Sequence, residues 1–316
     1  MTAQEKNAIV QAEQAEQVAR SHGHLVIIGG GEDKQRDMAI LKRFVELAGG
    51  PSAKIVVITA ASSVAANMWE TYDRAFADLG VTRHVHLHLS SRYEANDEAH
   101  IRDVADADGI FMTGGDQKRL LAIIGGTALD AEMHAALKLR GACIGGTSAG
   151  ASAMSGHMLA QGRAELHPEK GSVSLGAGLG FLHKVVIDQH FSERQRLSRL
   201  LSVVAQNPYL QGIGIDEDTA LVVERGIGIE VLGEGAVTIV DGRSMSTNVA
   251  EIDNHETPEL IDVRLHLLPA GSRYALPGSG VDDDRRGNDR HGDDRRCIPP
   301  PLLGFLENVT KRNPLS

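Results

Sequence analysis

Residues 146–150 read Gly-Thr-Ser-Ala-Gly, and this Gly-x-Ser-x-Gly spacing is typical of a nucleophile elbow. In such an elbow, a serine stands at the tip of a tight turn between a strand and a helix. The residues two positions before and after it approach each other, and Gly146 and Gly150 have no side chains to collide. We predict that Ser148 is a nucleophile and that the Ala149 N–H stabilises the oxyanion of the tetrahedral intermediate. A glycine-rich turn that only permits tight packing is the alternative.

A serine hydroxyl needs a base, and His190 is the stronger candidate among the fourteen histidines. It follows the apolar run 184–188 and precedes a helical pattern. In a doubly wound sheet the carboxyl ends of the strands meet at one edge, and both Ser148 and His190 follow such an end. His167, in the loop before Pro168, is a weaker alternative.

A third group should orient the imidazole, and the segment GIGIDEDTALVV at 212–223 carries three consecutive acids. Strand alternation separates Glu217 from Asp216 and Asp218, but it does not choose among them. The chain order of serine, histidine and acid differs from the order in α/β-hydrolases, in chymotrypsin and in subtilisin. These residues predict serine-nucleophile chemistry, but not an ordinary esterase.

The elements that must position these residues alternate between strand and helix patterns, which predicts an α/β fold with a doubly wound, mostly parallel sheet. We expect strands at 24–31, 53–61, 84–89, 108–115, 141–146 and 184–191, and helices at 33–50, 66–79, 117–139 and 192–206. Short strands at 212–216, 219–224, 228–233 and 236–240 are expected to form an antiparallel extension of the same sheet.

The chain of 316 residues shows no linker between residues 21 and 277, so we expect a single α/β catalytic domain there. Residues 1–20 are rich in Gln, Glu and Ala and are expected to form a polar arm or helix. Residues 278–316 are expected to form a C-terminal tail. Within it, residues 278–298 contain six Asp and five Arg with almost no apolar residues, which predicts disorder.

Composition excludes several classes of protein. The formal net charge of −10 argues against nucleic-acid binding and suits a cationic substrate, although solubility explains it equally well. Two cysteines, Cys143 and Cys297, do not make a disulfide framework. The first twenty residues lack the apolar core of a signal peptide, and no run approaches the roughly 18 apolar residues of a membrane helix. We expect a cytoplasmic protein that does not bind membranes.

Two other kinds of site have partial signals in the sequence. His84, His86 and His88 alternate along one face of a predicted strand, but no cluster of Cys or carboxylates accompanies them, so we expect no metal site. The segment GGGED at 29–33 lies between a strand and a helix, as a dinucleotide fingerprint would. Lys34 occupies the position of the last required glycine, so we expect no cofactor, and Asp33 is expected to cap the helix instead.

Five blocks carry a resemblance to a known family. They read LVIIGGGEDK at 25–34, TGGDQKRL at 113–120, IGGTSAGASAM at 144–154, IDQHFSERQRLSRLL at 187–201 and GIGIDEDTALVV at 212–223. Together they resemble the cyanophycinases, members of a serine peptidase family that also contains aspartyl dipeptidase. The resemblance implies a flavodoxin-like three-layer sandwich similar to class I glutamine amidotransferases, and a homodimer.

The resemblance also implies an activity: an exopeptidase hydrolyses cyanophycin, multi-L-arginyl-poly-L-aspartate, to β-Asp-Arg dipeptides through an acyl-enzyme. It assigns the nucleophile to Ser148, the base to His190 and the orienting acid to Glu217. An aspartyl dipeptidase that cleaves short peptides is the nearest alternative. A nucleotide-binding module and an inactive scaffold with the same fold are less favoured.

The same resemblance implies residues around the triad. The amides of Gly115 and Asp116 would supply a second oxyanion donor. The residues implied in substrate binding are Gln117, Asp188, Gln189, Arg194, Arg196 and Arg199. Arginines can fork onto substrate carboxylates, although an ordinary solvated helix has the same pattern. Asp188 would pair with a substrate guanidinium or with a structural arginine.

Overall fold

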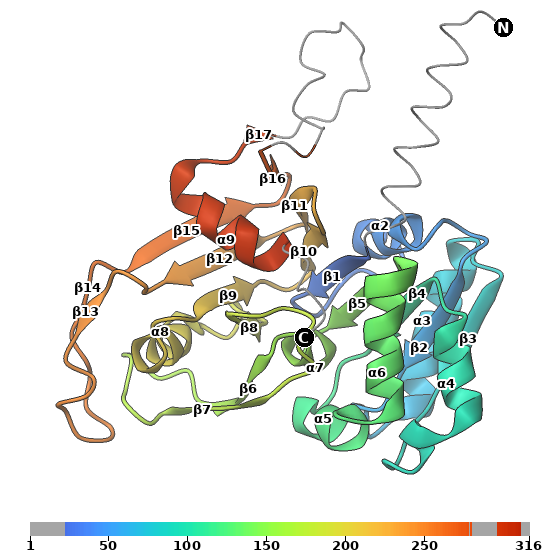
Figure 1. The fold of residues 1–316 in the computed structure, drawn as a ribbon, viewed down its shortest axis with the longest axis horizontal. Helices are drawn as coiled ribbons and strands as arrows, with labels where there is room; N and C mark the ends of the chain where they lie inside the picture. The colour runs from blue at the N-terminus through green and yellow to red at the C-terminus, as the bar shows by residue number, and fades with distance from the viewer. Residues whose placement is uncertain (1–22, 278, 280–295, 311–316) are drawn as a thin grey trace, which may run out of the picture.

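The computed structural model describes residues 23–277, 279 and 296–310, and a nine-stranded sheet forms its centre (Figure 1). The strand order is β17-β16-β11-β10-β1-β5-β4-β2-β3. Their bounds are β1 His24–Ile28, β2 Lys54–Ile58, β3 Arg83–Leu87, β4 Gly109–Met112, β5 Cys143–Thr147, β10 Thr219–Glu224, β11 Gly228–Gly233, β16 Arg273–Ala275 and β17 Arg296–Cys297. Strands β1 to β5 pair in parallel, whereas β10, β11 and β16 join them as antiparallel neighbours. The predicted α/β fold with a mostly parallel sheet is confirmed.

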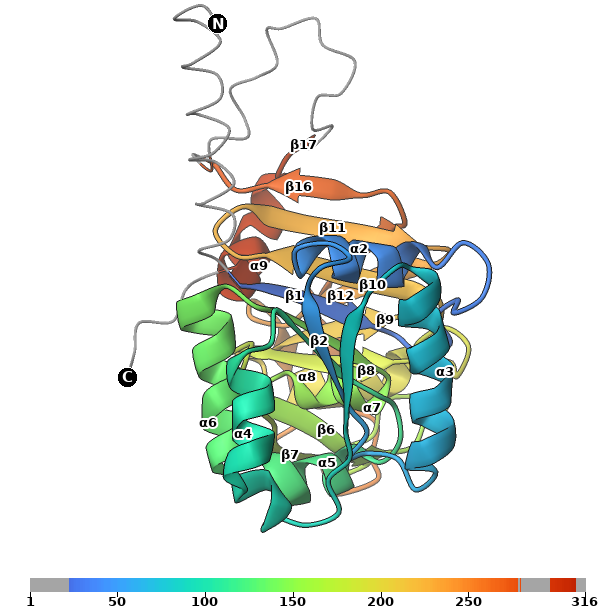
Figure 2. The ribbon, with the colours of Figure 1, turned by 90° about the vertical axis from the view of Figure 1, so that its right-hand side faces the viewer.

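Helices cover both faces of this sheet, which explains why its central strands are continuous apolar runs. Helices α2 (Ala39–Leu47) and α3 (Ala65–Asp78) pack against alternate strand residues such as Val26 and Ile28. The opposite face, which includes Leu25 and Ile27, is covered by α4 (Glu98–Ala105), α5 (Gln117–Ile124) and α6 (Ala128–Ala135). Figure 2 shows α3 on one side of the sheet, and α4 and α6 on the other.

The predicted extension is wrong in part, because two of its four strands, those at 212–216 and 236–240, belong to a second sheet of order β15-β12-β9-β8. Its strands are β8 Val185–Gln189, β9 Gln211–Ile215, β12 Ala236–Asp241 and β15 Arg264–Pro269. Strands β8 and β9 are parallel, and α8 (Leu197–Gln206) connects them. A Cβ on Gly214 would lie 2.5 Å from the Phe191 ring, so glycine lets the covering segment pack directly on β9. Only β10 and β11 extend the central sheet as predicted.

The remaining elements are short. They are η1 Glu94–Asn96, the π-helical segment η2 Ala136–Arg140, α7 Ala149–Ala153, the hairpin β6 His157–Gly162 with β7 Val173–Ala177, and the ribbon β13 Ser246–Thr247 with β14 Leu260–Ile261. No single helix among the residues described is long and apolar enough to cross a membrane. One pair, α5 with residues 128–140, meets that test jointly, but it bends by 97°.

Two predicted helices begin later than expected. Residues 33–38 wrap around the Asp33 carboxylate, which accepts hydrogen bonds from the amides of residues 35–38, and α2 starts at Ala39. Asp33 therefore caps a turn that precedes the helix. Residues 191–196 form turns before α8, and both His190, just before them, and Gln195 adopt positive φ. In both places, local side-chain and turn geometry competes with the helical pattern.

The predicted tail needs correction over residues 296–310. Strand β17 pairs with β16, and helix α9 (Pro300–Thr310) buries Leu302, Phe305 and Leu306 in the main core. The apolar residues of α9 recur at helical spacing, a signal that the neighbouring Asp/Arg-rich segment obscured. The other parts of the predicted arm and tail that lie outside the described residues are 1–20, 278, 280–295 and 311–316.

Candidate active site

Ser148 stands on a turn between β5 and α7. Its φ of 51° and ψ of −108° are unusual for a residue with a side chain. A Cβ on Gly146 would lie 2.7 Å from the Gly150 carbonyl, and a Cβ on Gly150 would lie 2.4 Å from the Met112 oxygen. Neither position therefore has room for a side chain, as the elbow spacing predicts.

A continuous chain of hydrogen bonds runs from this serine. The Oγ atom of Ser148 is 2.9 Å from Nε2 of His190, and Nδ1 of His190 is 2.5 Å from Oε1 of Glu217. The His190 side chain is 13% exposed and that of Glu217 is 41% exposed, so this series of hydrogen bonds reaches the protein surface. His167 lies on an exposed loop, and the ring within hydrogen-bond distance of Ser148 belongs to His190.

The three consecutive acids take different positions. Asp216 is buried, and its carboxylate accepts from the amides of Ser192 at 3.1 Å and Ala236 at 3.0 Å. Asp218 accepts from the Asp33 amide at 2.9 Å. Glu217 is the one of the three that is hydrogen bonded to His190. The structure thus separates one candidate for the orienting acid from two neighbours that hold the backbone.

The glycine turn after β1 connects all three segments of the site, a role that the sequence did not reveal. Three consecutive carbonyl oxygens, on the last residue of β1 and the first two residues of the turn, each accept a backbone hydrogen bond from one segment: Ile28 from Ser148 at 3.0 Å, Gly29 from His190 at 2.8 Å and Gly30 from Asp218 at 2.8 Å. The GGGED segment at 29–33, which has part of the pattern of a dinucleotide fingerprint, therefore lies under the site. Three successive glycines at a strand end were the available signal.

The predicted oxyanion donors need one correction. Ala149 is the first residue of α7, where a backbone N–H has no partner within the helix. The Asp116 amide donates to the Ala61 carbonyl at 2.9 Å, so it is already engaged. The loop does lie beside Ser148, because a Cβ on Gly114 would be 3.5 Å from the Ser148 Cβ. Of the predicted pair, Gly115 is therefore the remaining candidate.

Gln117 begins α5 and is half-buried at the same loop. Its side-chain amide donates to the Leu159 carbonyl of β6 at 3.1 Å. The side chain thus links α5 to the β6–β7 hairpin in this structure.

The predicted substrate-binding arginines fall into two groups. Arg199 pairs with the buried carboxylate of Asp188 and also donates to the Gly162 carbonyl at 2.8 Å. Arg196 is buried and donates to Asp188 at 3.3 Å, to the Gln189 side chain at 3.0 Å and to the Gln189 carbonyl. Arg194 is exposed on the turn after His190.

This arrangement corrects the expectation that all three arginines fork onto substrate. Burial lowers the pKa of Arg196 to about 10, and the nearby carboxylate of Asp188 opposes that change. Asp188 has structural arginines as partners, which was one of the two alternatives for it. Arg196 and Arg199 hold the backbone just before His190, so Arg194 is the exposed cation of the group.

The alternating histidines also have partners within the protein. His84 Nε2 lies 2.8 Å from Asp73, and the ring of His86 stacks on Trp69 with the centroids 4.8 Å apart. Oγ1 of Thr59 lies 2.9 Å from His86 Nε2 and 3.3 Å from His88 Nδ1. In the described part of the chain, no group of three or more His, Cys, Asp or Glu could hold a metal ion.

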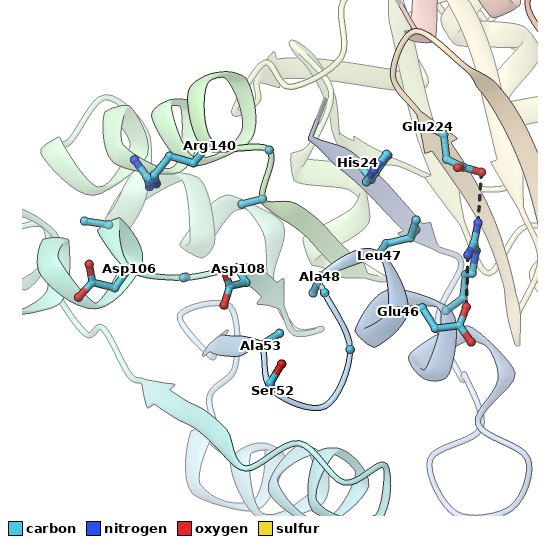
Figure 3. Close-up of a pocket in the computed structure, with 17 residues that line it drawn as sticks. His24, Glu46, Leu47, Ala48, Ser52, Ala53, Asp106, Asp108, Arg140 and Glu224 are labelled. Carbon is cyan, nitrogen blue, oxygen red and sulfur yellow. Dashed lines mark hydrogen bonds and ion pairs between the residues drawn. The ribbon is translucent and has the colours of Figure 1, made fainter. Parts of the chain in front are cut away.

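Figure 3 shows a cavity of about 870 Å³. Its lining residues His24 and Ala142 stand at the amino ends of β1 and β5, whereas Ser148 follows the carboxyl end of β5. The cavity lining also includes Asp108, Arg140 and an ion pair between Arg43 and Glu224. None of the triad residues lines it. The chemistry described above therefore belongs to the other end of the sheet.

Comparisons with known proteins identify the family of this chain. A model of peptidase family S51 matches residues 25–231. Cyanophycinase of Geminocystis herdmanii is 40% identical over 251 residues, which cover 79% of this chain and 92% of that protein. Cyanophycinase of Thermosynechococcus vestitus is 37% identical over 302 residues, which cover 94% of this chain and 90% of that protein.

A solved structure has the same fold. The crystal structure of a peptidase from an acI-B1 Actinobacterium superposes with a TM-score of 0.61 at 24% identity, covering 80% of this chain and 97% of that one. At this identity the match supports the fold, whereas the family model and the relatives above establish the family. The resemblance read from the five sequence blocks is confirmed, and the chain belongs to peptidase family S51.

Proposed function

We propose that this chain is a cyanophycinase that hydrolyses multi-L-arginyl-poly-L-aspartate to β-Asp-Arg dipeptides. The observation that carries the proposal is the hydrogen-bonded chain from Ser148 through His190 to Glu217 at the elbow. The names of the relatives at 36–40% identity supply the substrate class. The exposed Arg194 beside the triad suits a substrate with free carboxylates.

The geometry supports acyl transfer in two halves. His190 Nε2 takes the Ser148 hydroxyl proton as Oγ attacks a carbonyl carbon of the polymer backbone. The N–H groups of Ala149 and Gly115 donate to the tetrahedral oxyanion. Glu217 holds the imidazole in one orientation and stabilises its protonated form.

The second half returns the enzyme to its starting state. His190 gives its proton to the leaving amine as the C–N bond breaks, and the acyl group stays on Ser148 as an ester. Water then attacks the ester carbonyl while the same imidazole takes its proton. Collapse of the second tetrahedral intermediate returns that proton to Ser148 and releases the new carboxylate.

Insoluble cyanophycin provides the direct test. Wild type should release soluble β-Asp-Arg, and Ser148→Ala should lower the rate by about 10⁴-fold or more, because the nucleophile is lost. Ser52→Ala, at an exposed position by the opposite cavity, is the matched control and should keep full activity. Equal release by wild type and Ser148→Ala would contradict the proposal. No step uses a metal, so EDTA should leave the rate unchanged.

The aspartyl dipeptidase alternative is separated by substrate. Wild type should prefer cyanophycin to α-Asp dipeptides in kcat/KM. Exopeptidase action should release dipeptide from the first minutes while the remaining polymer shortens slowly, whereas internal cleavage would produce intermediate lengths first. A preference for the short α-linked peptides would favour the alternative.

The same proposal includes a cytoplasmic homodimer. Light scattering coupled to size exclusion should give twice the mass of one chain, 33.8 kDa. Fractionation of the native host should recover the activity with soluble cytoplasmic markers. A monomeric mass at working concentration would contradict the dimer.

A further inference from the structure

A carboxylate lies buried directly beneath the elbow. Glu32 is 3% exposed and follows the glycine turn, and three donors converge on its side chain. Thr147 Oγ1 donates to Oε2 at 2.7 Å, the Tyr72 hydroxyl donates to Oε1, and Lys34 Nζ lies 3.1 Å from Oε1. A buried carboxylate is tolerated when its oxygens are satisfied in this way.

The donors of this cluster are themselves fixed. Lys34 Nζ also donates to the Glu32 carbonyl at 2.9 Å and lies over the Tyr72 ring, 5.4 Å from its centroid. Tyr72 is 1% exposed, and burial together with the charge of Glu32 raises its pKa, so its hydroxyl stays a donor. The groups of this cluster are therefore partnered with one another, and the cluster has no role in the proton transfers described above.

Its position connects it to the nucleophile. Thr147 is the last residue of β5, and it immediately precedes Ser148. Ser148 has a positive φ, a conformation that surrounding contacts must hold. Glu32 ties Thr147 to the same segment whose carbonyls bind the amides of Ser148 and His190.

We propose that Glu32 is a positioning residue for Ser148, acting through the Thr147 hydroxyl. The carboxylate anchors the last side chain of β5 to the segment after β1, so that the strained serine and the His190 imidazole keep a fixed separation. The inference rests on the proposed serine-peptidase mechanism, but not on the identity of the polymer.

The test uses two readouts on the full chain. One is kcat and KM for cyanophycin, and the other is the rate at which a fluorophosphonate probe labels Ser148, with Ser148→Ala as the blank. The variants are Glu32→Gln, Thr147→Val and Thr147→Ser. The control is Val104→Ala, which shortens a buried side chain on α4, a helix that carries no residue of the site.

A positioning role predicts a specific pattern. Glu32→Gln and Thr147→Val should lower kcat and the labelling rate in parallel by about 10- to 100-fold, because small displacements of a nucleophile cost this much. KM should stay within about twofold, since the substrate contacts are kept. Thr147→Ser, which keeps the hydroxyl, should recover most of the loss.

A purely structural role predicts a different one. If Glu32→Gln and Thr147→Val label no more slowly than Val104→Ala does at the same loss of Tm, the inference is overturned. If Glu32→Gln fails to fold, Thr147→Val against Thr147→Ser decides alone. Should wild type label but release no dipeptide, the substrate proposal fails, and the labelling rates still decide the role of Glu32.

Discussion

The imidazole of His190 lies directly against the Cα of Gly30. A Cβ on Gly30 would be 2.3 Å from Cε1 and 2.6 Å from Nε2 of the ring. The absence of a side chain at this position is therefore what lets the ring lie between Ser148 and Glu217. A residue 160 positions away in the chain shapes the site without any chemistry of its own.

Gly30→Ala should abolish most activity. The new methyl group must displace the imidazole, and a misplaced base costs at least about 100-fold in kcat. Gly49→Ala is the matched control, because φ is +111° there and +106° at Gly30, and nothing lies within 4 Å of a Cβ on Gly49. Backbone strain should lower the free energy of unfolding of both variants by about 1–2 kcal/mol, measured by denaturant unfolding. If Gly30→Ala retains wild-type kcat, the contact does not matter.

Glu217→Gln should lower kcat by about 10³- to 10⁴-fold with little change in stability. The amide keeps the shape, but it cannot stabilise the protonated imidazole or fix its tautomer. Hydrolysis of cyanophycin under saturating substrate measures the effect. Glu234→Gln, an exposed acid on the turn between β11 and β12, should behave as wild type. A near-normal Glu217→Gln would point to another orienting acid.

The arginines after His190 should separate by readout. Arg194→Ala should raise KM for the polymer and leave Tm unchanged, because the side chain is exposed. Arg199→Ala should lower Tm and should lower the free energy of unfolding by about 3–5 kcal/mol, because it leaves the buried Asp188 with one guanidinium fewer. Thermal unfolding and Michaelis kinetics on both variants check this. The reverse assignment, with stability lost at Arg194, would contradict the structure.

Asp33 predicts a pH dependence of stability. Hydrogen bonds from backbone amides, that of Met38 foremost, lower the pKa of its carboxyl group in the folded protein. The pKa of this group in the unfolded protein is about 3.9, so the ionised carboxylate stabilises the fold at pH values above about 3.9. This stabilisation is lost as the pH falls toward the lower pKa of the folded protein. Asp33→Ala should therefore lower Tm at pH 7, and the difference from wild type should shrink below about pH 4. Asp37→Ala, whose side chain is 82% exposed, should show no such trend.

Much of the site could be read from local patterns. The turn brings Gly146 and Gly150 together across four positions, so the spacing of Gly146, Ser148 and Gly150 was sufficient to predict the elbow, although the Met112 carbonyl of β4 also excludes a side chain at Gly150. His190 was predictable because it follows an apolar strand. The central sheet was predictable because strands buried on both faces are continuous apolar runs.

The rest depends on contacts between distant segments, which spacing does not encode. Alternation could not choose among Asp216, Glu217 and Asp218, because the choice depends on where a strand of the second sheet ends relative to the imidazole. The arginine pattern after His190 is typical of a binding face, but two of its members pair with the buried Asp188. Sequence patterns thus determined the chemical groups and their local turns, whereas tertiary packing decided which groups meet, since hydrogen bonds act over about 3 Å.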